Sequence, residues 1–331
     1  MLFRSRKLLL GALVLLGSAV FGRGAEAADL RKVSIQIDGA AVPYYAPLYL
    51  AQEKGYFAEQ GLDVEFYYSA GADIVKNVGV GNVEFGFPNA DSVIVGRGAG
   101  IPVKVVHTTY QHGLGATIFK RSSGISGPAD LKGKKVAVTS LASPNYIQLQ
   151  VMLKEAGLAV SDLDLEVIGT GAIVGALADG QVDAIVFSML RTVELRNQGV
   201  DVDEIRSDTF LPSHGNVLIA GEKLLKDEPE LVEKFVSALD KSLDYIIGGH
   251  SREAVELSVS KYAPSFGDRV DVVTRILDEI FIPYLWTSDY TKAHGLGASD
   301  AERWGRSIAI LKEYGVLKTA PSAEDLLYVR P

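Results

Sequence analysis

The sequence of 331 residues predicts an α/β protein of two lobes, each a mostly parallel sheet flanked by helices, joined by two hinge strands. Strand-like and helix-like apolar patterns alternate along the chain, which is typical of a parallel sheet with helices on its faces. A block of about one hundred residues then recurs in the same order. No Pro-rich or Gly-rich linker separates the two blocks, so strands that cross between lobes are expected instead of a flexible tether.

In the first block, β-branched or alternating apolar stretches predict four strands, at 32–38, 62–68, 83–87 and 101–110. Apolar residues at helical spacing predict helices at 46–61 and 91–100, each closed by glycine, and the segment 72–81 is expected to be a short helix or turn. The first block therefore alternates strand and helix throughout.

The second block begins with a strand at 134–139 and matches the first at a nearly constant offset. Pro43-Tyr44-Tyr45 corresponds to Pro144-Asn145-Tyr146, and LDVEF at Leu62 corresponds to LDLEV at Leu163. GNVEFGFPN, residues 81–89, corresponds to GQVDAIVFS, residues 180–188. Collinear matches of this kind predict two structurally equivalent lobes.

The rest of the chain is predicted to be helical. Leu231, Phe235, Leu239 and Leu243 recur every four residues as one apolar helix face, and Ser299 is expected to cap the last long helix. The predicted domains are a signal peptide at 1–27, a first lobe at 28–112 plus 224–331, and a second lobe at 113–223.

The N-terminal residues have the pattern of a secretory signal peptide. Basic residues precede an apolar run from Leu8 to Phe21, and Ala25-Glu26-Ala27 follows as a cleavage site. The run is shorter than the ~20 residues a membrane span needs, which disfavours an anchor. The chain has no cysteine, so neither disulfides nor lipid attachment at cysteine are expected. We therefore expect a periplasmic protein, cleaved after about Ala27, that is not a lipoprotein.

The net charge and the absence of known catalytic motifs exclude several classes of function. Removing four basic residues and one acid with the signal peptide takes the formal net charge from −8 to −11, which argues against nucleic acid or an anionic membrane as partner. No nucleophile elbow, Walker loop or metal-ligand spacing of histidines is present. Gly169, Gly171 and Gly175 depart from the dinucleotide-binding spacing. We expect no enzyme activity, no metal and no cofactor.

Ligands of open α/β sheets bind beyond the carboxyl ends of the strands, so the loops after the first and third strand of each lobe are expected to face each other. These loops span 38–47, 87–92, 139–146 and 187–191. Aromatic rings supply apolar contacts, and serine, asparagine and helix N-termini supply hydrogen bonds. The predicted ligand-binding residues are Asp38, Tyr44, Tyr45, Phe87, Asn89, Asp91, Tyr110, Ser140, Ser143, Asn145, Tyr146, Ser188 and His214.

Structural roles compete for several of these residues. Ser143 followed by Pro144 is a strong helix start, and Asp91 is a candidate cap of the next helix. His112 and His214 flank the predicted hinge crossings, where a structural role is expected for histidine. Arg191 has the place of a solvated helix residue, so a guanidinium clamp for a strongly anionic ligand is not expected.

Several stretches carry a family resemblance: APLYLAQEKGYFAEQGLDVEF, GNVEFGF, GAGIPVKVV, SGISGPADLKGKKVAV, MLKEAGL, LADGQVDA and EKLLKDEPELVEKFVSAL. Together they resemble the periplasmic solute-binding proteins of ABC importers, in the branch that takes up thiamine pyrimidine precursors, riboflavin, aliphatic sulfonates, taurine and nitrate-like ions. The resemblance implies a solute trapped between two lobes and delivered to an ABC permease with a cytoplasmic ATPase. A monomer is expected.

The resemblance also bears on the solute. The C-terminal stretch with Trp286 and Trp304 is similar to members that bind pyrimidine or flavin-like heterocycles, whereas the first loop matches them only at Asp38, Tyr44 and Tyr45. A small aromatic or heterocyclic solute is the leading hypothesis, and an aliphatic sulfonate, taurine or nitrate-like anion is the alternative. A secreted enzyme on the same fold is the more distant alternative, since the sequence offers no recognised arrangement of nucleophile, base and orienting group. The related pyrimidine synthase is a self-consuming enzyme with a cysteine cluster, and a chain with no cysteine and an export signal does not match it.

Overall fold

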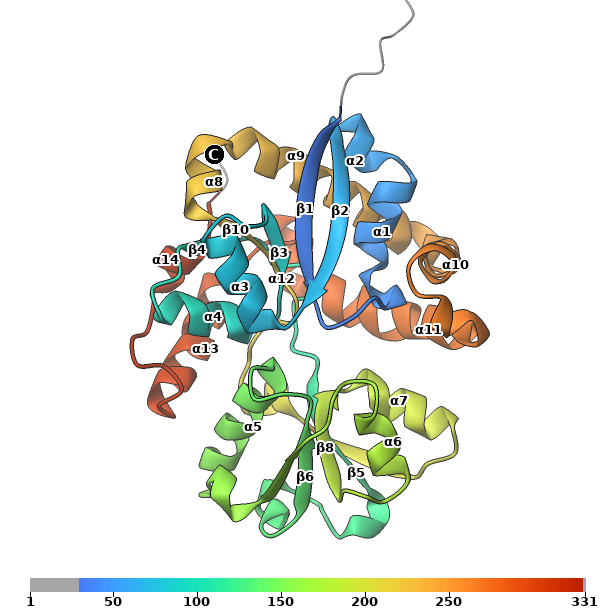
Figure 1. Cartoon of the computed structure of the whole chain (residues 1–331), viewed down its shortest axis with the longest axis vertical. Helices are drawn as coiled ribbons and strands as arrows, with labels where there is room; N and C mark the ends of the chain where they lie inside the picture. Colours follow the sequence, from blue (N-terminus) through green and yellow to red (C-terminus); the bar gives the residue numbers. More distant parts are fainter. Residues whose placement is uncertain (1–29, 330–331) are drawn as a thin grey trace, which may run out of the picture.

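The computed structural model describes residues 30–329, so the predicted signal peptide lies outside the described residues. Two five-stranded sheets, each flanked by helices, lie one beyond the other along the longest axis of the molecule (Figure 1). The predicted α/β fold of two lobes is confirmed. Within 30–329, no helix is both long enough and apolar enough to cross a bilayer.

The first sheet has the strand order β2-β1-β3-β10-β4. Its strands are β1 (Arg31–Asp38), β2 (Leu62–Ser69), β3 (Phe85–Phe87), β4 (Val103–His107) and β10 (Leu218–Gly221). β1 alternates apolar and polar residues, and Val33, Ile35 and Ile37 are buried beneath the helices. This alternation fixes the register of β1 against β2, because a shift by one residue would expose the apolar side chains.

The second sheet repeats the first in the order β7-β6-β8-β5-β9. Its strands are β5 (Gly115–Lys120), β6 (Lys135–Val138), β7 (Asp164–Val167), β8 (Ala184–Ser188) and β9 (Val202–Arg206). β6, β7 and β8 occupy the places that β1, β2 and β3 occupy in the first sheet. The internal repeat seen in the sequence is therefore a repeat of topology.

Both sheets are mostly parallel, as predicted, and each contains one strand that runs antiparallel to the rest. β1 pairs in parallel with β2 and β3, but β10 pairs antiparallel with β3 and β4. In the second sheet β5 is likewise antiparallel to β8 and β9. In each sheet the inserted antiparallel strand is the one that has just crossed from the other lobe, because a crossing chain enters the sheet from the cleft side.

Eleven of the described α-helices accompany the first sheet and three the second (Figure 1). Those of the first lobe are α1 (Ala46–Glu53), α2 (Tyr56–Glu59), α3 (Gly71–Gly79), α4 (Ala90–Gly98), α8 (Glu222–Asp227), α9 (Pro229–Tyr245), α10 (Ser251–Lys261), α11 (Val270–Ile276), α12 (Asp289–His294), α13 (Ala301–Glu313) and α14 (Ala323–Leu326). Those of the second are α5 (Pro144–Glu155), α6 (Ile173–Ala178) and α7 (Leu190–Asn197). Shorter turns are η1 (Pro43–Tyr45), η2 (Arg121–Ser123), η3 (Pro128–Leu131), η4 (Val160–Asp162), η5 (Ser207–Thr209) and η7 (Pro264–Arg269), with π-helical stretches η6 (Ile246–His250) and η8 (Leu277–Trp286).

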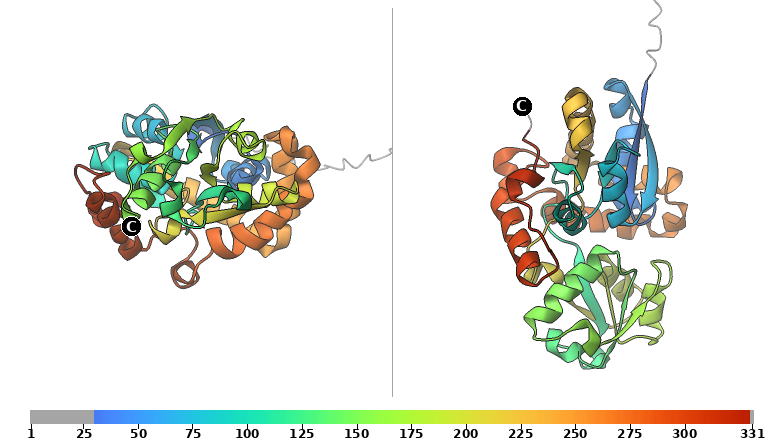
Figure 2. Two further views of the ribbon diagram at one scale, coloured as in Figure 1. Left: turned by 90° about the horizontal axis from the view of Figure 1, so that it is seen from below. Right: turned by 60° about the vertical axis from the view of Figure 1, so that its left-hand side comes forward.

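The C-terminal helices form a flank of the first lobe that extends toward the second lobe (Figure 2). The predicted apolar face of α9 is buried. Asp300, not Ser299, caps α13, because its carboxylate accepts the N–H groups of Glu302 and Arg303. The hydroxyl of Ser299 instead shares a hydrogen bond of 2.6 Å with Thr108.

The chain crosses between the lobes at 108–114 and 210–217. Neither described crossing segment forms a ladder strand, although Asn216 makes an isolated bridge with Asn89. The predicted boundary after residue 223 assigns β10 to the second lobe, whereas its hydrogen bonds place this strand in the first sheet. The predicted bounds of the two lobes as separate domains stay a prediction.

Candidate functional site

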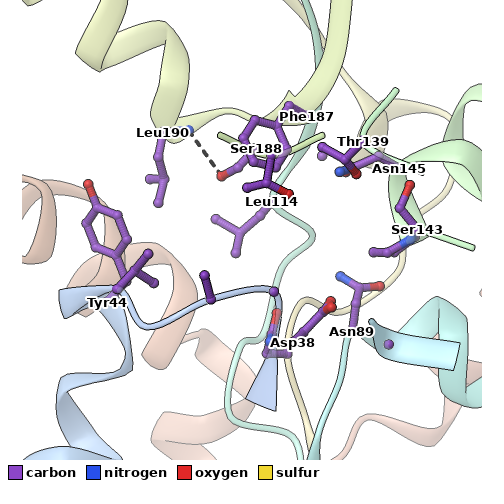
Figure 3. Close-up of a pocket in the computed structure, with 18 of the residues that line it drawn as sticks. Asp38, Tyr44, Asn89, Leu114, Thr139, Ser143, Asn145, Phe187, Ser188 and Leu190 are labelled. Carbon is purple, nitrogen blue, oxygen red and sulfur yellow. Dashed lines mark hydrogen bonds between the residues drawn. The ribbon is translucent and has the colours of Figure 1, made fainter. Parts of the chain in front are cut away.

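A cavity of about 510 Å³ lies between the two lobes. Its lining comes from the loops after β1, β3, β6 and β8, which are the four loops that the repeat singled out, and from further segments of both lobes. Residues of both lobes surround the same open space in Figure 3. The cavity has the size of a site for a small organic molecule.

Helix N-termini converge on this cavity because each helix starts directly after a strand end. Asn89 caps α4 by accepting the N–H of Asp91 at 3.0 Å, and Ser143 caps α5 by accepting the N–H of Tyr146 at 3.3 Å. Pro144 occupies the first turn of α5, where its missing N–H costs nothing. The predicted cap at Ser143 is confirmed, and the cap of α4 is Asn89 instead of Asp91.

One side of the cavity is aromatic and apolar. Tyr44 stacks on Phe281 with ring centroids 5.3 Å apart, and both rings are almost fully buried. Tyr45 and Phe187 are half-buried and also line the cavity, and the guanidinium of Arg191 lies over the ring of Phe187. Tyr44 and Leu190 lie together at this end of the space (Figure 3). This side suits a flat or apolar part of a ligand.

The opposite side offers hydrogen-bonding groups. Asn89, Ser143 and Asn145 lie together there, from both lobes (Figure 3). The hydroxyl of Ser143 donates to the carbonyl of Ser140 at 2.8 Å, so it is partly used within its own loop. The cavity thus has an apolar end and a polar end, which favours an elongated solute with the same division.

Asp38 is the acidic residue of the cavity. Its carboxylate accepts the backbone N–H groups of Gly71 and Gly39, while burial outweighs both and raises its pKa to about 6. Tyr45 is tied to the same strand end, because its hydroxyl donates to the carbonyl of Asp38 at 2.6 Å. The carboxylate of Asp38 is therefore held in place at the lining of the cavity.

Arg191 lines the cavity and is largely shielded, with 16% of its side chain exposed, so the expectation of a solvated residue is wrong. Its guanidinium donates to both carboxylate oxygens of Glu194, at 2.7 and 2.6 Å. Glu194 also accepts a hydrogen bond of 3.3 Å from the hydroxyl of Tyr44 in the other lobe. The charge of Arg191 is thereby neutralised inside the protein.

Most of the predicted ligand-binding residues line the cavity; their contact with a solute stays a prediction. The residues that line it are Asp38, Tyr44, Tyr45, Asn89, Tyr110, Ser140, Ser143, Asn145 and Ser188. Further lining residues were not singled out as ligand-binding, among them Leu114, Thr139, Phe187, Leu190, Arg191, Asn216 and Phe281. Thr139, Phe187 and Arg191 lie in the loops named from the repeat, whereas no sequence signal marks Asn216 or Phe281.

Four predicted residues do not reach the cavity lining. Phe87 lies behind it and packs edge-to-face against both Tyr45 and Tyr110. Asp91 is fully buried, and Tyr146 packs against the core of the second lobe. His214 is buried against Trp304 and its Nδ1 pairs with the carbonyl of Gln111, which supports the structural alternative.

Among residues 30–329, no group of three or more metal-ligating side chains is placed to hold an ion. Gly169 and Gly171 lie in the turn between β7 and α6, and Thr170 between them reaches the cavity.

The family described as NMT1/THI5 like matches residues 42–253 of the chain. The riboflavin-binding protein RibY of Chloroflexus aurantiacus is 28% identical over 87% of this chain and 82% of its own length. The 4-amino-5-hydroxymethyl-2-methylpyrimidine phosphate synthase THI13 of Saccharomyces cerevisiae is 29% identical over 65% of this chain and 67% of its own length.

Among solved structures, the alkanesulfonate-binding protein SsuA of Xanthomonas axonopodis pv. citri, bound to MOPS, superposes with a TM-score of 0.70. The match covers 92% of this chain and 100% of that one, at 16% identity. The periplasmic nitrate-binding protein NrtA of Synechocystis PCC 6803 has a TM-score of 0.58 at 17% identity, over 75% of this chain and 71% of that one. These likenesses show the fold of periplasmic binding proteins of ABC importers.

Proposed function

The chain belongs to the NMT1/THI5-like family, and from that premise we propose that it is the extracytoplasmic solute-binding component of an ABC importer. Its solute is a small aromatic or heterocyclic molecule that is held between the lobes. The observation that carries this proposal is the division of the inter-lobe cavity into an aromatic side and a hydrogen-bonding side.

The charges of the cavity favour a neutral or weakly basic heterocycle over an anion. Among the described lining residues, Asp38 and Arg191 are the two with charged side chains, and Arg191 is paired with Glu194. The acidic Asp38 is left to face the solute, where a ring N–H or an amino group would donate to it. A sulfonate or nitrate would meet this carboxylate without an unpaired cation to balance it.

The riboflavin-binding relative supports the same class of solute, since a flavin joins a flat heterocycle to a polar chain. In this chain the ring would lie against Tyr45 and Phe187. Polar groups would pair with Asn89, Ser143 and Asn145. Contacts made to both lobes at once stabilise the closed arrangement, and a membrane permease with its cytoplasmic ATPase would recognise that arrangement.

We further propose that the protein is a monomer that carries no catalytic activity. Catalysis would need a nucleophile, a base and an orienting group that converge on the solute. The serines around the cavity are instead engaged in capping and loop contacts, as Ser143 shows. The synthases among the relatives match a smaller part of this chain than the riboflavin-binding relative does, 65% against 87%. The chain also has no cysteine, whereas the related self-consuming pyrimidine synthase has a cysteine cluster.

Thermal-shift screening of the exported chain, followed by calorimetric titration, tests the proposal. The panel contains riboflavin, thiamine pyrimidine precursors, aromatic amines, alkanesulfonates, taurine and nitrate. We expect a flavin, a pyrimidine or another heterocycle to raise the melting temperature with one-to-one stoichiometry. Selective stabilisation by a sulfonate or nitrate would contradict the assigned solute class, and turnover of a bound solute would contradict the assignment as a binding protein.

A further inference from the structure

Asp91 and Gln148 join the two lobes inside the protein. Asp91 lies in the first turn of α4, and Gln148 lies in α5 of the second lobe. The amide Nε2 of Gln148 donates to Oδ2 of Asp91 at 2.8 Å. Both side chains are buried, with exposures of 0% for Asp91 and 3% for Gln148.

The second oxygen of each side chain has no partner. Oδ1 of Asp91 and Oε1 of Gln148 are both buried without a hydrogen bond among the described residues. Each is an acceptor, so neither can satisfy the other while Asp91 is ionised. A buried acceptor without a donor is destabilising, because it has lost its hydrogen bonds to water. Exchanging the amide nitrogen and oxygen of Gln148 would not help, since it would set acceptor against acceptor.

We propose that Asp91 holds a proton when the lobes are in contact, so that its carboxylic acid and the amide of Gln148 form a cyclic pair. The amide N–H donates to Oδ2, and the acid O–H on Oδ1 donates to Oε1. One proton thereby satisfies both buried acceptors and leaves the inter-lobe contact uncharged. The site binds a proton, and it couples proton uptake to contact between the lobes whichever solute occupies the cavity.

The surroundings of Asp91 agree with a neutral acid. Burial raises the pKa of Asp91 to about 6, more strongly than the polar side chains of Gln148 and Ser213 lower it. No cation among the described residues forms a hydrogen bond or ion pair with it. An ionised carboxylate would therefore lie between the lobes without a counter-charge.

None of the charged and titratable groups on the described elements around Asp91 is seen to form an ion pair with its carboxylate. On α3, Lys76 pairs with Asp73 at the surface, and on α5, Lys154 donates to the carbonyl of Tyr314. On its own helix, Arg97 forms an ion pair with Glu222. In and beside the crossing segments, Asp208 pairs with Arg206, and Arg303 of α13 contacts His112. The remaining groups are Glu155 on α5, His214 in a crossing segment and Asp38 at the cavity. Burial lowers the pKa of His214 to about 3, so this neighbour is neutral near pH 7.

The pair predicts a direction for the effect of pH. As pH rises through the pKa of Asp91, the acid loses the proton that bridges Oδ1 and Oε1, and the contact between α4 and α5 weakens. As pH falls, the contact re-forms and the lobes are held together. Proton uptake and lobe contact are then linked, so each favours the other.

Carbon-13 NMR measures the proton directly. Aspartate labelled at its carboxyl carbon is incorporated into the exported chain, and Asp91→Asn identifies the Asp91 signal by removing it. We expect that signal to titrate near pH 6 or above. Titration near the ordinary value of about 4 would overturn the proposal, since Asp91 would then be ionised and a water molecule would fill the gap.

Distance measurement between the lobes tests the coupling. The chain has no cysteine, so spin labels can be placed at Tyr67→Cys in the first lobe and Val167→Cys in the second, both exposed and outside the cavity lining. In the labelled parent, pulsed EPR is expected to show longer distances between the two spin labels as pH rises from 5 to 8.

Two substitutions give opposite expectations in the labelled background. Asp91→Asn places an amide N–H where the acid O–H would be, so short separations should persist at both pH values. Gln148→Met removes the donor and the acceptor, so the longer separations should persist at both. The coupling is overturned if the parent shows no change with pH, or if Asp91→Asn responds to pH as the parent does, in which case the proton is held elsewhere.

Discussion

The hydroxyl of Tyr44 in the first lobe donates a hydrogen bond of 3.3 Å to the carboxylate of Glu194 in the second. The same carboxylate is held by two hydrogen bonds from Arg191. One acidic side chain therefore closes the aromatic end of the cavity and neutralises the arginine that lines it. The chemistry of the cavity depends on this neutralisation, because an unpaired Arg191 would make the site attractive to anions.

Replacement of Glu194 by alanine should release that arginine. We expect the free energy of unfolding to fall by about 1 to 3 kcal/mol, because a largely buried guanidinium loses both of its acceptors. Affinity for an alkanesulfonate should rise at the same time, since Arg191 is then free to pair with it. Chemical denaturation and calorimetric titration measure the two effects.

Tyr44→Phe is the matched control for that substitution. It removes only the inter-lobe hydrogen bond and leaves the pair of Arg191 and Glu194 intact. Its stability should fall by about 1 kcal/mol or less, with no gain in sulfonate affinity. An equal gain in both variants would show that Arg191 is not the group that Glu194 restrains.

Removal of the aromatic faces of the cavity should weaken solute binding. We expect Tyr45→Ala and Phe187→Ala each to cost about 1 to 3 kcal/mol of affinity for the heterocycle found in the screen, because each ring is a half-buried contact surface. Tyr67→Ala, an exposed tyrosine outside the cavity, is the control. Unchanged dissociation constants for both cavity variants would remove these rings from the site.

Asp38→Asn should raise the stability of the protein and lower its affinity for the solute. The pKa of Asp38 in the folded chain is about 6, above its ordinary value of 3.8, so the folded state binds more protons than the unfolded state between about pH 4 and pH 6. The contribution of Asp38 to stability therefore falls as pH rises through this window. Asparagine does not ionise, so the variant keeps its stability over this pH range. We therefore expect it to be about 1 kcal/mol more stable than the parent at pH 7.

Binding should change in the opposite direction in this variant. An asparagine is a weaker acceptor than a carboxylate, so affinity for an N–H bearing heterocycle should fall by about 1 to 3 kcal/mol. Denaturation curves from pH 4 to pH 8 and titration calorimetry measure both quantities. A variant that is less stable than the parent at pH 7 and binds equally well would contradict the assigned role of Asp38.

Gly115, at the start of β5, permits the close approach of α5 to the sheet within the second lobe. A β-carbon there would lie 1.7 Å from Oε1 of Gln148 and 2.9 Å from Oγ of Ser207. Gly115→Ala should therefore destabilise the protein by about 1 to 3 kcal/mol through displacement of Gln148. Gly113→Ala, where the nearest atom would be 3.6 Å away, is the control. Equal melting temperatures for the two variants would contradict this packing.

Local patterns were sufficient to predict much of the fold. The alternation of Val33, Ile35 and Ile37 predicts β1 and its buried face, and the Ser143-Pro144 pair predicts the start of α5. The repeat predicts which loops meet, because equivalent strand ends in two facing lobes point at each other. These features depend on residues close in sequence, or on the comparison of two similar segments.

Features that depend on distant partners were not predicted. Arg191 resembles a solvated residue until Glu194 and Tyr44 are seen beside it, and Tyr44 is 150 residues away from Glu194. β10 has no local feature that shows it crosses back and enters the first sheet antiparallel. Phe87 lies in a predicted cavity loop, yet the pleat of β3 turns its ring behind Tyr45, which the sequence pattern does not reveal.

Identification of the solute tests the central claim most directly. The protein is purified from cells under mild conditions and denatured, and the released small molecules are identified by mass spectrometry. They are then titrated into the refolded protein in a calorimeter. We expect an aromatic or heterocyclic molecule that rebinds with one-to-one stoichiometry and loses affinity in Asp38→Asn. A released sulfonate or nitrate that rebinds with full affinity in that variant would contradict the account.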